Sequence, residues 1–103
     1  MARVVVSSTA DADTAGIIAY LAAQAGRQTA IKYNALFETL YDRLAGYPAS
    51  GPIRPALGPN TRICIVSPYI VIYHHIRNDD AVTVLRIVHS RRKISGKLLA
   101  ESP

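Results

Sequence analysis

Hydrophobic and polar positions alternate most clearly in the second half of the chain, in two runs separated by a short polar segment. The runs are Tyr69–Ile76 and Ala81–Ser90, and the segment between them reads RNDD. β-Branched and aromatic residues bounded by Asn and Asp are typical of a β-hairpin. The pattern therefore predicts two antiparallel strands joined by a turn near Asp79.

The period of two along each strand divides this hairpin into two faces. With the turn centred near Asp79, one face is expected to carry Ile70, Ile72, His74, Ile76, Val82, Val84, Arg86 and Val88. The other is expected to carry Tyr69, Val71, Tyr73, His75, Thr83, Leu85, Ile87 and His89. Both faces are largely apolar, and a chain of 103 residues has little material with which to cover two. We therefore expect a partner to close one of them.

Two helices are predicted in the first half of the chain. After N-cap candidates at residues 9–13, a first set of apolar residues recurs at helical spacing and ends before Gly26. The second helix has one continuous apolar stripe, formed by Ala30, Tyr33, Phe37, Leu40, Tyr41 and Leu44. Because Gly26 is the only break between them, the two helices should form an antiparallel hairpin.

Two further strands complete the predicted fold. They are Arg3–Ser8 and Arg62–Ser67, and the proline-rich segment at 49–60 is a loop. The order β-α-α-β-β-β predicts an α+β fold in which the helical hairpin packs on one face of a mainly antiparallel sheet. We expect a single domain over residues 1–94 and a flexible tail over residues 95–103.

Arg86 indicates which face of the sheet is left open, because burying its charge unpaired beneath the helices would be costly. The opposite face suits the helix stripes better, so the open face displays aliphatic residues around a cation. Such a patch fits an amphipathic peptide that bears Asp or Glu. The predicted partner contacts are Ile70, Ile72, His74, Val84, Arg86 and Val88. The alternative is that Arg86 merely extends to a sheet edge.

The net charge of +5 is unevenly distributed. Residues 1–53 hold four basic and four acidic side chains, whereas residues 54–103 hold eight basic and three acidic ones. A one-sided basic surface indicates an acidic peptide, a nucleic acid or a nucleic-acid enzyme as partner. The alternative is ordinary solubilising charge, and composition alone does not decide between the two.

The sequence offers no arrangement typical of a metal site or a cofactor site. His74 and His75 are adjacent in a strand and point to opposite faces, and His89 lies near the far end of the hairpin. A single cysteine and the absence of a nearby carboxylate argue further against zinc. The glycines form no phosphate-binding loop, and no Ser nucleophile motif is present. We expect neither a metal nor a cofactor.

Cys64 is the only cysteine, so no internal disulfide can form and a reducing cytosol is the natural setting. The first apolar run is too short for a signal peptide. No stretch approaches the ~20 apolar residues that a membrane span needs. We expect a cytoplasmic protein with no membrane association.

Metal-free RNA cleavage is the one enzymatic alternative. It needs a general base, a general acid and a cation for the phosphate. His74 or His89 could transfer protons, and the cations would be Arg62, Arg86, Arg91 and Arg92. The carboxylates are poorly placed, in the turn, on a helix and in the tail. We favour the interpretation that the histidines are satisfied in or beside the core.

The ordered set of segments resembles the ParE toxins of the RelE/ParE superfamily. The residues that carry the resemblance are YIVIY at 69–73, an acidic turn, VLRIVHSRR at 84–92, GYP at 46–48 and GPIR at 51–54. It spans roughly residues 3–94 and includes the order β-α-α-β-β-β. One departure is Ser90, which replaces the glycine common before the Arg pair.

The resemblance implies the toxin of a bacterial type II toxin–antitoxin pair, neutralised by a ParD-type antitoxin that would contact the open face described above. It further implies inhibition of DNA gyrase rather than catalysis. RelE-type relatives instead cut mRNA on the ribosome, using basic, Tyr or His residues on the open face and at the chain end. No Tyr or His follows His89 here, which favours gyrase as the target. The expected target contacts are Arg62, Arg91, Arg92 and Lys93, without sequence-specific binding to nucleic acid.

Overall fold

A computed structural model of the chain describes residues 1–92, 94 and 96–100. The N-terminal half contains β1 (Arg3–Val6), α1 (Ser8–Ala25) and α2 (Arg27–Gly46). The C-terminal half contains β2 (Thr61–Val66), β3 (Tyr69–Ile76), β4 (Ala81–His89) and the short α3 (Gly96–Ala100). Two 3-10 turns, Pro55–Leu57 and Arg77–Asp79, lie in the connections.

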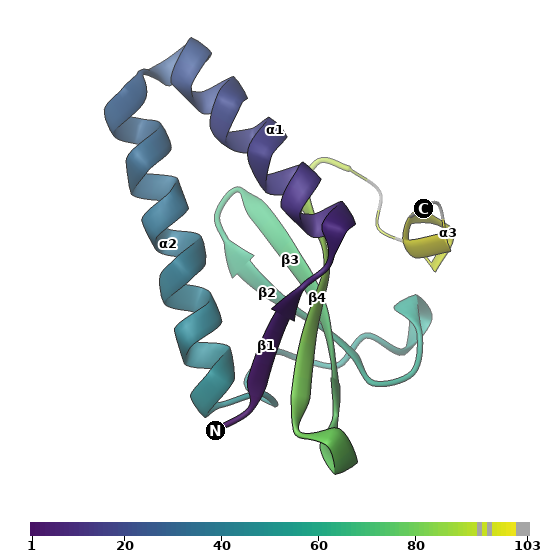
Figure 1. Cartoon of the computed structure of the whole chain (residues 1–103). Helices are drawn as coiled ribbons and strands as arrows, with labels where there is room; N and C mark the ends of the chain where they lie inside the picture. Colours follow the sequence, from purple (N-terminus) through teal and green to yellow (C-terminus); the bar gives the residue numbers. More distant parts are fainter. Residues whose placement is uncertain (93, 95, 101–103) are drawn as a thin grey trace.

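The four strands form one mixed sheet in the order β1-β4-β3-β2. β2 pairs with β3 and β3 pairs with β4 in antiparallel fashion, whereas β1 pairs with β4 in parallel. The helical hairpin α1–α2 lies against one face of this sheet (Figure 1). The predicted α+β fold and its element order are therefore confirmed.

The helical hairpin begins and reverses at residues whose chemistry suits those positions. The Ser7 hydroxyl accepts a hydrogen bond from the Ala10 N–H at 3.0 Å, so the helix starts earlier than the predicted N-cap range. Gly26 reverses the chain with a φ of 95°, a conformation that L side chains rarely adopt. The reversal brings α2 alongside α1, with α2 supplying most of the buried helix side chains.

The main core lies between the helical hairpin and the sheet. The α2 stripe contributes Phe37, Leu40 and Leu44, all buried. The sheet contributes Tyr69, Val71, Tyr73, Val82, Val84 and Ile87 to the same cluster. Burying side chains of this size contributes about 1.5–3 kcal/mol each relative to leaving them exposed, which makes this layer the main source of stability.

The β3–β4 hairpin contains a register shift that the alternation pattern did not reveal. Ile72 pairs with Arg86, but Tyr73 pairs with Val84, so Leu85 is an extra residue in β4. A bulge of this kind exchanges the faces of all residues on one side of it. The predicted faces are correct between the bulge and the strand ends at Tyr69 and His89. They are wrong for β4 between the bulge and the turn.

Val84 is the most important of these corrections. It was predicted on the open face, but it is fully buried with Tyr73 in the core beneath the helices, and Val82 is buried there too. Leu85 was predicted on the face with Tyr69 and Val71, but it packs with the second cluster on the opposite face, described below. The physical reason is the extra residue, because a period of two holds only while the ladder is unbroken.

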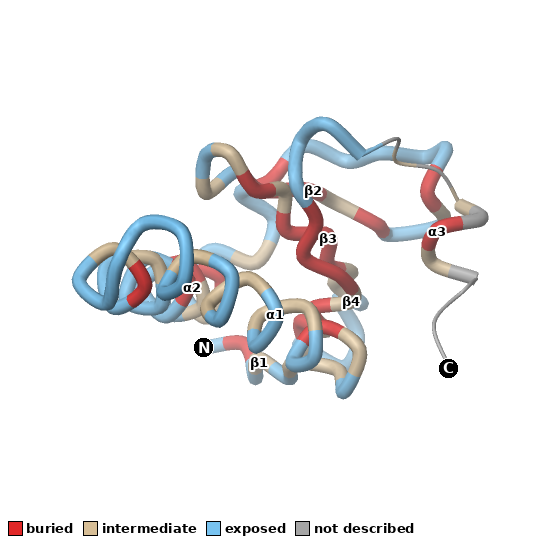
Figure 2. Tube along the Cα trace, turned by 90° about the horizontal axis from the view of Figure 1, so that it is seen from above, coloured by how far each residue is buried: buried red, intermediate tan, exposed pale blue. Residues whose placement is uncertain are grey.

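The second face of the sheet is covered by the chain itself. A smaller cluster is formed by Leu57, Ile63, Ile72, Val88 and Leu98. Leu98 comes from α3, which Figure 2 shows on the side of the sheet opposite to α1 and α2. The expected exposed patch on this face is therefore wrong for Ile72 and Val88, which are buried. Part of the tail expected to be flexible is thus described here as a helix, and residues 95 and 101–103 lie outside the described residues.

None of the helices in the described part of the chain is long and apolar enough to cross a membrane.

Candidate functional site

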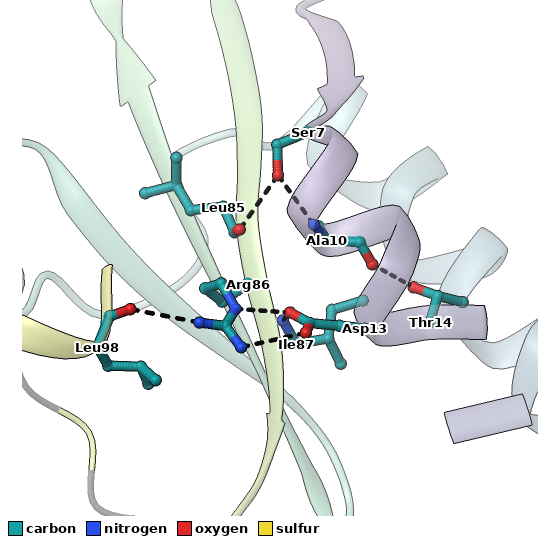
Figure 3. A network of polar contacts seen from close by, with 8 residues as sticks. All are labelled: Ser7, Ala10, Asp13, Thr14, Leu85, Arg86, Ile87 and Leu98. Carbon is teal, nitrogen blue, oxygen red and sulfur yellow. Dashed lines mark hydrogen bonds and ion pairs between the residues drawn. The ribbon is translucent and has the colours of Figure 1, made fainter. Parts of the chain in front are cut away.

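The junction between β1 and α1 shows how the helical hairpin is fixed to the sheet. β1 pairs with β4 only as far as Val6 and Val84, so the edge of β4 beyond that point needs other partners. The Ser7 hydroxyl donates to the Leu85 carbonyl at 3.1 Å, and an Asp13 carboxylate oxygen accepts from the Ile87 N–H at 3.0 Å. The N-cap residue Ser7 and the α1 residue Asp13 therefore continue the hydrogen bonding of the edge where β1 ends (Figure 3).

Arg86 is paired inside the chain. Its Nε and Nη2 donate to the two carboxylate oxygens of Asp13 at 2.8 and 3.1 Å, and its Nη1 donates to the Leu98 carbonyl at 3.3 Å. The residue is only 8 % exposed. Arg86 therefore links α1, β4 and α3 (Figure 3), and the interpretation that it is a cation in an open patch is wrong. Sequence reasoning had assigned Asp13 only to the start of a helix.

The remaining predicted partner contacts differ in accessibility. Ile70 and His74 are half-buried on the face that carries α3, so both can be contacted in part. Val84, Ile72 and Val88 are buried by the chain itself. A role in antitoxin binding stays a prediction for Ile70 and His74.

A groove of about 1030 Å³ lies between the helical hairpin and the end of the β3–β4 hairpin. We call it the basic groove, because the exposed Arg91 and Arg92 stand at its rim. Its lining comprises Ala12, Asp13, Gly16, Ile17, Tyr20, Leu21, Thr29, Tyr33, Pro68, Tyr69, Ile87, Val88, His89, Arg91 and Arg92. Asp13, the acidic residue of this lining, is paired with Arg86.

Aromatic rings form one wall of the basic groove. Tyr69 packs edge-on against Tyr33, with ring centroids 5.7 Å apart, and against His89 at 5.8 Å. Burial raises the pKa of Tyr69, with smaller rises from Tyr33 and Tyr20, so the phenol stays neutral at physiological pH. The His89 Nδ1 accepts the Arg91 N–H at 3.0 Å, which fixes where the chain leaves the strand. Tyr20 is 63 % exposed and can contact a partner directly.

A second groove, of about 860 Å³, lies on the other side of α1. We call it the acidic groove, because its charged residues are Asp11, Glu38 and Asp42. The rest of its lining is apolar or neutral: Val4, Val6, Thr14, Ala15, Ile18, Ala19, Ala22, Asn34, Phe37, Tyr41 and Ala45. Sequence reasoning missed this groove, although the helical spacing of its acidic and alanine positions was visible.

Arg62 does not line the basic groove, and its side chain instead stabilises the loop that follows α2. Its Nη1 donates to the carbonyl oxygens of Gly51 at 2.8 Å and of Ala49 at 3.2 Å. The Tyr73 hydroxyl supports the same loop by donating to the Pro48 carbonyl at 2.9 Å and accepting from the Gly51 N–H at 3.0 Å. The structure therefore does not bring Arg62 together with Arg91 and Arg92. Lys93, the last predicted target contact, lies outside the described residues.

The three histidines do not form a cluster. His74 and His75 lie on opposite faces of β3, and His89 pairs with Tyr69 at the other end of that strand. Within residues 1–92, 94 and 96–100, no three His, Cys, Asp or Glu side chains are grouped so that they could hold a metal ion. The candidate site therefore rests on the two grooves.

Two solved structures have a fold similar to that of this chain. The chain is similar to one described as the chromosomal ParDE toxin–antitoxin system from P. aeruginosa, with a TM-score of 0.72 and 20 % identity over 86 % of this chain and 96 % of that chain. It is also similar to one from the toxin–antitoxin complex RelBE2 of Mycobacterium tuberculosis, with a TM-score of 0.61 and 21 % identity over 85 % and 96 %. At these identities the likeness shows the fold.

The family follows from the sequence itself. A family model described as the ParE toxin of the type II toxin–antitoxin system, parDE, matches residues 4–94. The chain therefore belongs to the ParE toxin family of type II toxin–antitoxin systems. No curated protein sequence matches it.

Proposed function

We propose that this ParE-family toxin acts in the bacterial cytoplasm as a non-enzymatic inhibitor of DNA gyrase, and that a ParD-type antitoxin neutralises it. The observation that carries the proposal is the basic groove, where two exposed arginines stand beside an aromatic wall. Such a surface suits an enzyme that works on DNA, because arginine binds carboxylates and phosphates through a planar set of donors.

The chemistry around the arginines favours inhibition over RNA cleavage. Cleavage needs proton donors and acceptors that titrate near neutral pH and lie within hydrogen-bond reach of the scissile phosphate. In the described part of the basic groove, His89 is the only histidine, and its Nδ1 already accepts the Arg91 N–H. Arginine stays protonated, so Arg91 and Arg92 can hold a phosphate but are poor bases.

An antitoxin partner is supported by the apolar surface that remains exposed. Tyr20, Ile31, Leu36, Ile53 and Ile65 are each more than a third exposed. The two solved neighbours also come from systems in which a toxin is paired with an antitoxin. We expect the antitoxin to cover part of this surface and to reach the half-buried Ile70 and His74 on the second sheet face.

The experiment that tests the proposal compares two readouts after induced expression without antitoxin. Inhibited supercoiling by purified gyrase and gyrase-dependent DNA breaks in arrested cells are the expected results. Co-expression of the protein from the adjacent reading frame should restore growth. Mapped mRNA cuts at the ribosomal A site, with intact chromosomal DNA, would overturn the gyrase proposal in favour of the RelE-like endonuclease.

A further inference from the structure

The basic groove gathers aromatic rings as well as cations. Tyr20, Tyr33 and Tyr69 line it, and so does the His89 ring. Tyr20 and His89 are exposed and Tyr33 is half-buried, so a ligand can contact these three rings. Burial is the main cause of the raised pKa of Tyr69, and Tyr33 and Tyr20 raise it further, because the three phenols lie close together. The groove therefore offers a cluster of accessible rings in addition to charge.

The buried Tyr69 ring fixes the orientation of two of these rings. The planes of Tyr33 and His89 stand at 86° and 85° to that of Tyr69, with ring centroids 5.7 and 5.8 Å away. The Tyr33 hydroxyl also donates to the Ser67 carbonyl at 3.2 Å. Rings that are already held in place lose little conformational freedom when a ligand binds, which favours affinity.

The cations of the groove are next to the rings. Arg91 and Arg92 come just after the strand that ends at His89, and the His89 Nδ1 accepts the Arg91 N–H at 3.0 Å. Both arginines are exposed. The acidic residue of the lining, Asp13, is paired with Arg86 at 2.8 Å. A guanidinium binds phosphate through a planar set of donors, so the rim can hold an anion beside an aromatic ring.

A ligand that combines phosphates with accessible planar rings is single-stranded nucleic acid. Its unstacked bases can lie on tyrosine or histidine rings while its phosphates contact arginine. The bases of a duplex already stack on one another, which would leave the rings of the groove without a partner. An acidic peptide supplies anions but does not supply a ring with each of them. The groove volume of about 1030 Å³ slightly exceeds the ~300–1,000 Å³ of pockets that bury a drug-sized ligand, so a nucleotide fits.

We propose that the basic groove binds a single-stranded segment of DNA. Bases would lie on Tyr20, Tyr33 and His89, and phosphates would contact Arg91 and Arg92. The inference rests on the proposed function in one respect, since gyrase supplies the DNA that the toxin would contact. Because every base has a π face, we expect no sequence preference. The toxin would then bind the DNA and the enzyme together.

The first test removes one exposed ring and measures the binding of fluorescently labelled oligothymidylate to the full-length toxin by anisotropy. Tyr20→Ala should weaken binding by about fivefold or more, because a base loses its stacking surface. Tyr20→Phe keeps the ring and should stay within about twofold of the unchanged protein. Tyr47→Ala is the matched control, since Tyr47 is also exposed and lines neither groove. Circular dichroism checks that each variant is folded.

The second test removes one cation and follows the dependence of binding on salt. Each phosphate that a protein neutralises on a single strand contributes about 0.7 to the slope of log K against the logarithm of the salt concentration. Arg91→Ala should therefore reduce this slope by about 0.7. Arg27→Ala should leave the slope unchanged, because Arg27 is an exposed arginine that lines neither groove. Equal slopes for the two variants would contradict the proposed phosphate contact.

Competition identifies the ligand. Unlabelled oligothymidylate should displace the probe about tenfold more effectively than a DNA duplex or polyglutamate of equal charge, and at least as well as oligouridylate. Equal displacement by the duplex or by polyglutamate would overturn the proposal. A preference of about tenfold for oligouridylate would also overturn it, and would favour the RNA-cleaving alternative.

The outcomes separate this inference from the proposed function. If the unchanged toxin inhibits gyrase but does not bind oligothymidylate, the inference is wrong and the proposed function stands. The same conclusion follows if Tyr20→Phe weakens binding as much as Tyr20→Ala, because stacking would then not be the contact. If the toxin binds oligothymidylate through Tyr20 and Arg91 but leaves gyrase active, the groove is assigned correctly and the proposed function is wrong.

Discussion

The two sides of α1 differ in charge, in side-chain size and in the kind of partner each can hold. On one side, α1 residues such as Tyr20 line the basic groove together with tyrosine rings and the Arg91–Arg92 pair. On the other side, alanines and carboxylates line the acidic groove. The net charge of +5 for the whole chain therefore does not indicate the charge of either groove. The α1 helix therefore separates two grooves that differ in charge and in side-chain size.

The largest expected effect comes from removing the residue that fixes α1 between the two grooves. Asp13→Ala would leave the buried Arg86 guanidinium without its carboxylate and the Ile87 N–H without its acceptor. Breaking a buried pair by removing one partner typically destabilises a protein by ~3–5 kcal/mol. We expect a loss of this size in the free energy of unfolding, measured by urea denaturation, and a loss of both binding functions.

Asp11→Ala is the matched control for this prediction. Asp11 lies on the same helix but is exposed on the acidic side, so its removal should change the unfolding free energy by only about 0.5 kcal/mol or less. Equal stability of the two variants would show that the Asp13–Arg86 pair does not hold α1 on the sheet.

The next effect should separate the two grooves by function. Replacing both Arg91 and Arg92 with Ala removes the exposed cationic rim of the basic groove. We expect roughly tenfold weaker inhibition in a gyrase supercoiling assay, because rim charges mainly govern association with an oppositely charged surface. Antitoxin affinity, measured by titration calorimetry, should change much less.

A control with the same change in charge is available on other surfaces. Arg27 and Arg54 are exposed and line neither groove, so replacing both with Ala should leave gyrase inhibition within about twofold. If the two double variants inhibit gyrase equally, the basic groove is not the target site.

The smallest effect is expected at the floor of the acidic groove. Because the Tyr41 hydroxyl lacks a well-formed hydrogen bond, Tyr41→Phe should change the unfolding free energy at neutral pH by about 0.5 kcal/mol or less. Tyr73→Phe is the contrast, since that hydroxyl makes two hydrogen bonds and its loss should destabilise by about 1–3 kcal/mol.

Alkaline pH distinguishes the same two tyrosines from an ordinary surface phenol. Burial raises the pKa of both Tyr41 and Tyr73 above the usual 10.0, so the folded protein holds these protons more tightly than the unfolded chain. Their stabilisation is complete below about pH 10 and is lost as the pH rises through the folded pKa. Urea denaturation across this range should show a shallower loss for Tyr41→Phe than for the unchanged protein. A loss of identical slope would contradict the raised pKa of Tyr41.

The sequence was sufficient for the fold because each element carried its own periodicity. The α2 stripe, the reversal at Gly26 and the polar turn before Ala81 were each visible locally, and the order of elements then allowed few arrangements. The bulge was not visible, because Leu85 is apolar and so fits either face. The faces of Val82 and Val84 were therefore assigned wrongly.

The site was less predictable because its decisive contacts join distant parts of the chain. Asp13 and Arg86 are 73 positions apart, and the sequence around either residue does not indicate that the two form a pair. Arg86 was recognised as an unusual cation in a strand, but its partner was sought outside the chain. For that reason Arg86→Glu is expected to disrupt folding, because it would place a second carboxylate against that of Asp13. Whether α3 or an antitoxin covers Ile72 and Val88 could not be decided from a tail with weak patterning.

The parallel pairing of β1 with β4 has a consequence for how the protein is made. The first strand of the chain has no partner until the last strand exists, because Arg3 to Val6 pair with Ala81 to Val84. Helical hairpins rest on local contacts and form early, whereas pairing between distant strands must first overcome the entropy of closing a long loop. A ribosome adds about 5–20 residues per second, so α1 and α2 wait for seconds before the sheet can close beneath them. A chain released before His89 would therefore carry its helices without the strand that holds them.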